Sequence, residues 1–479
     1  MVHNNEKFFF LSCFLLVLLC EGYLFGSKII RHSEQASSFI QTRPIYMDII
    51  KRNHLALQYM YKKSGLSGSL ISVDTSFSES FSRDNAHSYF FPKNKSYVTI
   101  VGDSASVESQ KQRDVRAEWL GLPSTTNSIL YLKPYYRTSG FVVEYNQNIK
   151  NLLSFDMCSH WQVGIRLPVV IVENMVSVHE KSFVNNDDHS IASAFNEVSW
   201  IAQKITPAQT TVGFSDIQLY MSGSSYAQDH FIFGAHSGIV LPVAPDASHT
   251  YLFSPVRGNN GRFGIYGGVD MQVVLNETPR IWNVLLCASI ESYYFFHSTV
   301  IRTFDLKHKP WSRFLNFIRN DLVEQMPIPG VNVLTKSAHV RGQAYADFSL
   351  CIRFLSDYFQ GECGYGIWGH DAERIEYIKD DLEPIFGIAG TNTLTASNST
   401  IASKADNDST FKTIKTTDID LLSGASLSAL NHSFYVAFGT AKKGEHIDGF
   451  LGCGGMIEKG QRRGSLPLWT VWLKVGATI

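Results

Sequence analysis

Long runs of alternating apolar and polar residues recur through this 479-residue chain, and they constrain its fold more than any other feature. In the run 339–354, Phe348 and Ile352 share one face, while Asp347 and Arg353 share the other. A period of two residues is the pattern of a β-strand with one apolar and one polar face. The sequence therefore predicts an all-β protein.

The alternating segments are also long. Strands of soluble proteins typically span roughly 5–6 residues, whereas a tilted strand that crosses a membrane needs about 9–11. The final segment, LPLWTVWLKVGATI, runs to the last residue of the chain. We expect about 12 strands, within a range of roughly 10–14. They lie near 69–81, 129–145, 160–172, 213–222, 230–242, 262–275, 282–297, 339–354, 358–369, 432–441, 447–457 and 467–479.

The connections between these segments alternate between long and short. The long ones are 82–128, 173–212, 243–261, 298–338 and 370–431, and the shorter ones are 146–159, 223–229, 276–281, 355–357 and 442–446. Only 458–466 breaks the order, because it is short where a long connection is due. Transmembrane barrels have short turns on one membrane face and long loops on the other. Since hydrocarbon offers no hydrogen-bond partner to an open sheet edge, the strands must close into a ring. The pattern predicts a transmembrane antiparallel up-and-down β-barrel.

The N-terminus has the parts of an export signal. Lys7 precedes the apolar run 8–19, and small residues follow as far as Gly22. The run is short of the roughly 20 residues that a membrane helix needs, so a cleaved signal peptide is the better interpretation. We predict a signal peptide at 1–22, an N-terminal periplasmic extension or plug at 23–68, and the barrel at 69–479.

Together, the signal, the alternating strands and the C-terminal strand resemble Gram-negative outer-membrane β-barrel proteins of the porin-like kind. The resemblance covers most of 69–479 and is one of pattern, without a motif of any particular family. It implies an outer-membrane location, contact with outer-membrane lipid, and recognition of the C-terminal strand by the barrel-assembly machinery. Such proteins commonly end on an aromatic residue, whereas this chain ends on Ile479.

The polar faces of the predicted strands provide candidate pore-lining residues. They are Arg166, Asp270, Glu291, Arg341, Asp347, Arg353, Glu362 and Lys474. One interpretation is a pore that passes small polar solutes, and the other is an ion-paired interior that closes the barrel, because buried charges need partners. Acids and bases occur here in similar number, which predicts weak ion selectivity if the pore is open.

The predicted function is a channel or porin-like transporter for small solutes. The alternatives are a closed structural or adhesive outer-membrane barrel, and a secreted soluble β-rich binding protein. A net charge of −1 leaves no electrostatic footprint for nucleic acid. The sequence holds no HExxH, GxSxG or phosphate-loop motif, so we predict no enzymatic activity.

Neither a cofactor nor a metal is expected. The stretch 364–369, GYGIWG, matches GxGxxG, but the segment before it alternates instead of forming a buried apolar strand. Five cysteines follow the signal, and they show no paired spacing: Cys158, Cys287, Cys351, Cys363 and Cys453. This spacing predicts neither a disulfide framework nor a zinc site. Within the long loops we expect helices at 187–204, 310–324 and 371–381, and a polar outside loop at 391–417.

Overall fold

The computed structural model describes most of the chain from residue 37 onward. The described residues are 37–48, 68–81, 95, 97–149, 160–183, 190–205, 208–227, 231–277, 283–319, 327–356, 359–379, 381–383, 385–388, 412–442, 444, 447–460 and 464–478. The predicted signal peptide, most of the segment 23–68 and most of the loop 391–417 lie outside these residues. Within them, no helix has the length and apolar character needed to span a membrane.

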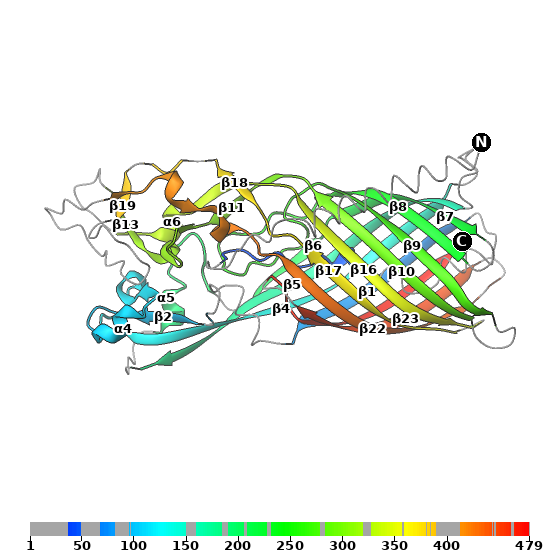
Figure 1. Ribbon diagram of the computed structural model, residues 1–479, viewed down its shortest axis with the longest axis horizontal. Coiled ribbons are helices and arrows are strands. Elements are labelled where there is room, and N and C mark those ends of the chain that lie inside the picture. Colours follow the sequence, from blue (N-terminus) through cyan, green and yellow to red (C-terminus); the bar gives the residue numbers. More distant parts are fainter. Residues whose placement is uncertain are drawn as a thin grey trace.

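Twelve long antiparallel strands form a closed ring in which each strand pairs with the next along the chain (Figure 1). The ring is closed because the last of these strands pairs with the first. The first strand also pairs with the second, and the second pairs with the third. Each of the twelve predicted strands corresponds to one of these, so the predicted fold class is confirmed. The strands are β1 (Ser69–Ser80), β4 (Asn127–Asn148), β5 (His160–Ser182), β7 (Ile217–Ala227), β8 (Phe231–Leu241), β9 (Gly264–Glu277), β10 (Asn283–Phe295), β16 (Gln343–Leu355), β17 (Phe359–His370), β22 (Ala429–Lys442), β23 (Asp448–Gly460) and β24 (Leu468–Thr478).

The two ends of the barrel differ as the loop lengths predicted. At one end, which we call the turn end, short connections join β7 to β8, β9 to β10, β16 to β17 and β22 to β23, and the C-terminus lies there (Figure 1). At the other, the loop end, long insertions follow β1, β5, β8, β10 and β17. The short connection between β23 and β24 is again the exception.

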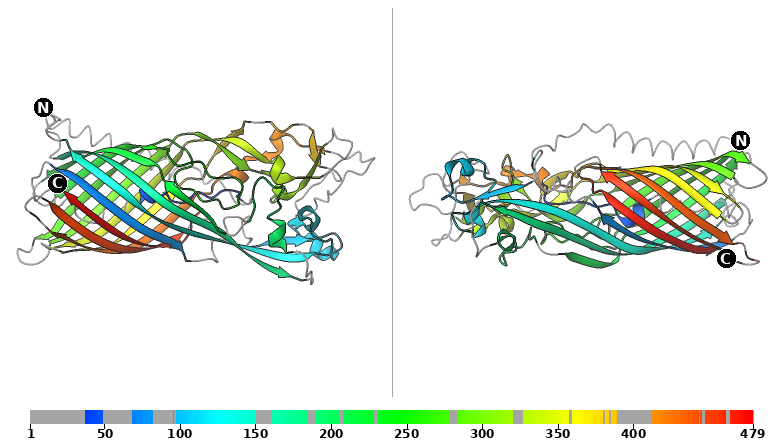
Figure 2. Two further views of the ribbon diagram at one scale, coloured as in Figure 1. Left: turned by 180° about the vertical axis from the view of Figure 1, so that it is seen from behind. Right: turned by 90° about the horizontal axis from the view of Figure 1, so that it is seen from below.

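The insertions build an outer part beyond the loop end (Figure 1). β4 and β5 are longer than predicted and continue out of the ring as a two-stranded ribbon (Figure 2). β2 (Val98–Val101) and β3 (Val115–Arg116) extend this ribbon on one side, and β6 (Gln209–Phe214) pairs with β5 nearer the barrel. Three small sheets complete the outer part. The first contains β11 (Ser298–Thr303), β15 (Thr335–Val340) and β18 (Ile375–Ile378), and the second contains β12 (Asp305–Leu306) and β21 (Ile419–Asp420). The third contains β13 (Asn316–Arg319), β14 (Ile328–Pro329), β19 (Phe386–Ile388) and β20 (Lys412–Thr413).

The helices of the outer part are short. They are α4 (Val107–Lys111), α5 (Ile191–Ala194), α6 (Gly330–Val333), and single turns such as η3 (Ala117–Leu120), η4 (Ser312–Phe314) and η7 (Leu421–Gly424). A further turn, η1 (Ile45–Met47), lies in the N-terminal part of the chain. The three predicted helices are therefore mostly wrong. Only α5 forms within 187–204, 310–324 holds η4 and β13, and 371–381 holds β18.

The outward faces of the barrel strands are apolar and exposed. Phe434, Val436 and Phe438 on β22 are 67%, 51% and 53% exposed. Such apolar residues recur at every second position on most barrel strands. A soluble protein rarely exposes a continuous apolar surface of this extent, whereas a membrane barrel requires one. This surface contradicts the alternative prediction of a secreted soluble binding protein.

Candidate functional site: the barrel lumen and the segment within it

The inward faces of the barrel strands carry more acids than bases. Among the described residues, eight carboxylates face inward and only three Lys or Arg side chains do so. The carboxylates belong to Asp74, Glu144, Asp270, Glu291, Asp347, Glu362, Asp448 and Glu458, and the cations to Arg166, Arg353 and Lys474. The sequence had suggested a balance of charge. In the structure the inward faces are mainly acidic, because Asp74, Glu144, Asp448 and Glu458 also point inward. We call this inward surface, with its eight carboxylates, the acidic wall.

Arg341 is the predicted pore residue that does not join this wall. It lies between β15 and β16, where its backbone N–H donates to the carbonyl of Arg374 at 2.8 Å, and its side chain is exposed. Its position beside the outer part follows from the start of β16 at Gln343, four residues later than the predicted strand.

A continuous network of side chains crosses six strands of the lumen. Arg166 donates two hydrogen bonds to Glu144 Oε1, at 3.1 and 3.0 Å, and a third to Gln218 at 3.1 Å. Tyr220 also donates to Glu144, and the Arg166 guanidinium lies 4.4 Å from the centre of the Tyr220 ring. Each member of the Glu144–Arg166 pair is therefore held by several partners, as a buried ion pair requires.

The network continues from Gln218 toward β8 and β9. Gln218 donates to the hydroxyl of Tyr293 at 3.1 Å, and Tyr293 donates to Glu291 at 2.9 Å. His236 Nε2 lies 2.8 Å from the other oxygen of Glu291, and its Nδ1 lies 3.6 Å from Asp270. His236 thus joins Asp270 and Glu291, two of the predicted pore residues.

Two further pairs connect adjacent strands. Arg353 Nε donates to Glu362 at 2.8 Å, directly across β16 and β17. Lys474 Nζ lies 3.4 Å from Asp74, directly across β24 and β1. The alternation in β1 already placed Asp74 on the polar face, so this partner was visible in the sequence although it was not predicted.

The described segment 37–48, which we call the luminal segment, lies inside the ring (dark blue in Figure 2). Arg43 Nη1 donates to Glu458 of β23 at 2.7 Å, and Nη2 donates to Asp347 of β16 and lies 3.4 Å from Asp48. The same guanidinium is 5.5 Å from the centre of the Trp368 ring on β17. One arginine therefore ties this segment to three strands.

The rest of the luminal segment packs against aromatic side chains of the wall. Tyr46 and Met47 are 3% and 0% exposed, and they belong to one buried cluster with residues from β7, β8, β9, β10, β16, β17 and β22. Tyr46 donates to Asp216 at 2.9 Å, just before β7. At its other end, Ser38 donates to the carbonyl of Thr303 in the outer part at 2.6 Å. The segment therefore runs from the outer part into the barrel.

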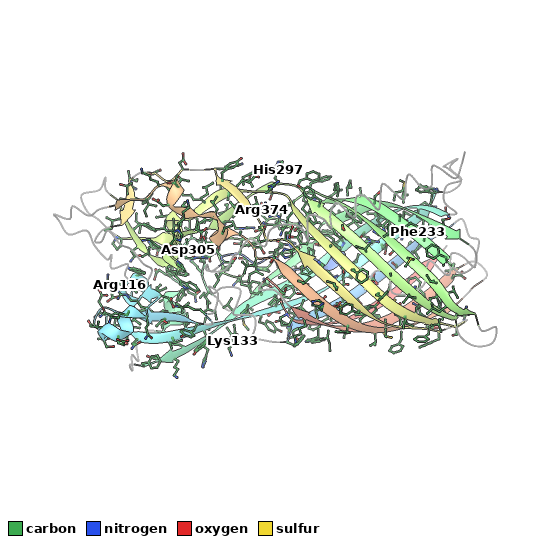
Figure 3. All side chains as sticks on the ribbon, in the orientation of Figure 1. Arg116, Lys133, Phe233, His297, Asp305 and Arg374 are labelled. Atoms are coloured by element: carbon green, nitrogen blue, oxygen red, sulfur yellow. The ribbon has the colours of Figure 1, made fainter. Side chains whose placement is uncertain are left out.

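The loop end of the lumen is crossed by an arginine–glutamate cluster. Arg262 donates to Glu373 and to Gln343, and Arg302 lies 3.7 Å from Glu373. Burial would raise the pKa of Glu373, but the charges of Arg262 and Arg302 outweigh burial and lower the pKa. Asp305 of the outer part (Figure 3) pairs in the same buried manner with Arg313, at 2.6 Å.

The glycines of 364–369 lie on β17 and precede another strand, β18, so the geometry of a dinucleotide site is not present there. A Cβ atom on Gly364 would lie 2.6 Å from Tyr435 Cε1, so this glycine permits close packing in the lumen. In the described part of the chain, no group of three or more His, Cys, Asp or Glu side chains is arranged to hold a metal ion.

No protein-family model and no curated protein matches the chain. Among solved structures, it is similar to an outer membrane channel from Pseudomonas putida F1, at 10% identity and a TM-score of 0.37, covering 86% of this chain and 96% of that one. It is also similar to the transport unit of the autotransporter AIDA-I from Escherichia coli, at 6% identity and a TM-score of 0.33, covering 87% and 91%. A third is a FadL homologue from Pseudomonas aeruginosa, at 8% identity and a TM-score of 0.29, covering 86% and 90%. The closed ring of strands and its apolar exterior give the chain the fold of a transmembrane β-barrel protein.

Proposed function

We propose that this protein is an outer-membrane channel for small polar solutes, and that the luminal segment 37–48 is its gate. The observation that carries the proposal is the placement of Arg43, whose guanidinium contacts Asp347, Glu458 and Asp48 inside the ring. A purely structural barrel could fill its interior from its own strands. Here the filling is a separate segment, which can leave without breaking the ring of backbone hydrogen bonds.

The alternative is a closed barrel whose outer part binds a partner. The network from Glu144 to Asp270 favours it to some extent, because paired charges rigidify a lumen. That network follows the wall from β4 to β10, however, whereas Arg43 is anchored to β16 and β23. Release of the luminal segment would therefore leave the wall network intact.

The acidic wall gives the channel a preference for cations. Eight inward carboxylates against three inward Lys or Arg produce a negative potential, and a low-dielectric passage of one sign concentrates ions of the other. When the luminal segment occupies the lumen, Arg43 offsets part of this charge. The segment also carries Asp48, so its departure removes no net charge, but it leaves Asp347 and Glu458 without Arg43 and facing the open passage.

Conductance across a planar bilayer tests the proposal. The full-length protein should show discrete openings that become more frequent when the luminal segment is removed by deletion of 37–48. In a salt gradient, the reversal potential should have the sign of cation preference. A deletion variant that runs as a folded barrel in unboiled SDS but never conducts would refute the channel and favour the closed barrel.

A further inference from the structure

Two cysteines of the lumen face each other directly across neighbouring strands. Cys287 of β10 and Cys351 of β16 are register partners in an antiparallel pair. Both are buried, at 6% and 5% exposure, and they belong to one buried cluster. Directly opposite residues in antiparallel strands have Cα atoms about 4.5–5.5 Å apart. This lies within the range of about 4.4–6.8 Å that a disulfide spans.

The surroundings of the pair hold Cys351 in place. Tyr435 of β22 belongs to the same buried cluster as Cys351, although β17 lies between their two strands. The aromatic ring of Tyr435 can extend over β17 toward Cys351 because Gly364, which has no side chain, lies between the two residues in the register. A Cβ atom at Gly364 would be 2.6 Å from both Cys351 Cβ and Tyr435 Cε1. The glycine thus makes room for a contact between a phenol and a thiol.

We propose that Cys287 and Cys351 form a redox-active dithiol, which is oxidised to a disulfide across β10 and β16. The chain between the two cysteines contains β11 to β15, so the bond would close the base of this insertion. The other two described barrel cysteines, Cys363 and Cys453, are exposed on the outer surface and have no such partner in register.

The oxidant is a disulfide of a second molecule, either a protein or a small thiol compound. One thiolate of the pair attacks this disulfide and forms a mixed disulfide, and one thiol of the oxidant leaves. The second cysteine of the pair then displaces the other half as a thiol. Two protons leave Cys287 and Cys351, and their two electrons reduce the oxidant to two thiols. Such bonds persist in oxidising compartments, including the periplasm to which an outer-membrane barrel is exposed.

The test uses the full-length protein extracted from membranes without reductant. It is incubated with hydroxyethyl disulfide, quenched in acid, unfolded, alkylated with N-ethylmaleimide and digested for mass spectrometry. We expect the Cys287 and Cys351 peptides to be linked to each other, and Cys363 and Cys453 to carry the alkyl label or a hydroxyethyl adduct. Recovery of Cys287 and Cys351 as labelled thiols, or as two separate adducts, would overturn the proposal.

Two variants separate this bond from unrelated effects. In a boiled, non-reduced gel the wild type should run faster than its reduced form, because the bond keeps a loop closed. Cys287→Ser should abolish that difference, and Cys363→Ser, which alters an outward cysteine on a neighbouring strand, should not.

Discussion

Arg43 Nη1 lies 2.7 Å from Glu458 Oε1, so a residue that precedes the barrel in the chain is bound to its second-last strand from the inside. Both side chains are almost fully buried, at 8% and 2% exposure. A buried carboxylate that loses its partner is strongly destabilised. The contact therefore both holds the luminal segment and neutralises the wall around it.

Replacement of Arg43 tests whether this contact keeps the channel closed. Arg43→Met removes the charge that holds Asp347 and Glu458, so the luminal segment should dissociate from the wall. We expect openings in planar bilayers to become several-fold more frequent than in wild type, with the same preference for cations in each opening, because the luminal segment has left the wall in both open states. Arg341→Met is the matched control, because Arg341 is exposed outside the ring. Equal opening frequencies for wild type and Arg43→Met would show that the segment does not gate the lumen.

The pair formed by Arg166 and Glu144 should contribute to the stability of the barrel. Arg166→Met leaves Glu144 buried without the cation that donates hydrogen bonds to it, while the neutral donor Tyr220 remains. Loss of one partner of a buried ion pair costs about 3–5 kcal/mol. Urea unfolding in detergent micelles should show a loss of this size. The double variant Arg166→Met, Glu144→Gln should recover most of it, whereas equal instability of the single and double variants would mean that the pairing contributes little.

The apolar exterior predicts which substitutions the membrane opposes. Val436 faces outward on β22 and is 51% exposed, so Val436→Arg would place a cation in hydrocarbon. A cation at mid-depth on a barrel exterior costs about 2–4 kcal/mol. Val198 is 89% exposed in the outer part, and Val198→Arg should change the free energy of unfolding by less than about 0.5 kcal/mol. The free energy of unfolding is measured for both variants in lipid vesicles. Equal effects of the two substitutions would mean that the outward face of β22 contacts water and not lipid.

The strands could be predicted from sequence because one rule acts on all of them. Each barrel strand needs apolar residues outside and tolerates polar ones inside, so the period of two persists over its whole length. β5 was predicted to end at residue 172 but continues to Ser182, because beyond the ring its buried face, which includes Val172 and Val176, packs into the core of the outer part.

The helices predicted in the loops were mostly wrong because a stripe of apolar residues can be buried in more than one kind of local structure. Ile191 and Phe195 have helical spacing, but both are buried in the core of the outer part after only a short turn of helix. Trp311 follows the proline that suggested a helix start, yet it adopts a left-handed backbone with φ 70°. Local spacing alone cannot show which of these packings a loop adopts.

The candidate site was predicted only where alternation was visible. The inward residues Arg166, Arg353 and Lys474 were found on predicted strands, whereas Glu458 lies one residue beyond the predicted end of its strand. Arg43 lies in a segment with no period of two, and its role depends on contacts with Asp347 and Glu458 that are hundreds of residues away. Such a contact has no local signal in the sequence.

Asp420 gives a prediction on the pH dependence of the outer part. Burial raises the pKa of this carboxyl from 3.8 to about 6, and its Oδ2 has no hydrogen-bond partner. Its Oδ1 accepts the backbone N–H of Leu422 at 3.1 Å and so caps η7. Because the folded state holds this proton more tightly than the unfolded state, the contribution to stability is complete below about pH 3.8 and is lost as the pH rises through about 6.

Asp420→Asn keeps the cap and removes the titrating group. The variant should be more stable than the wild type at pH 7.5, and the two should converge as the pH falls from 6 to below 3.8, where Asp420 is protonated in both the folded and the unfolded state. Thermal unfolding of the outer part, followed by near-ultraviolet circular dichroism across this range, measures the difference. A wild type that loses stability relative to Asp420→Asn as the pH falls would reverse the sign and refute the assignment. A difference that does not vary with pH would show that Asp420 does not titrate in this window, and that burial of its carboxylate is compensated elsewhere.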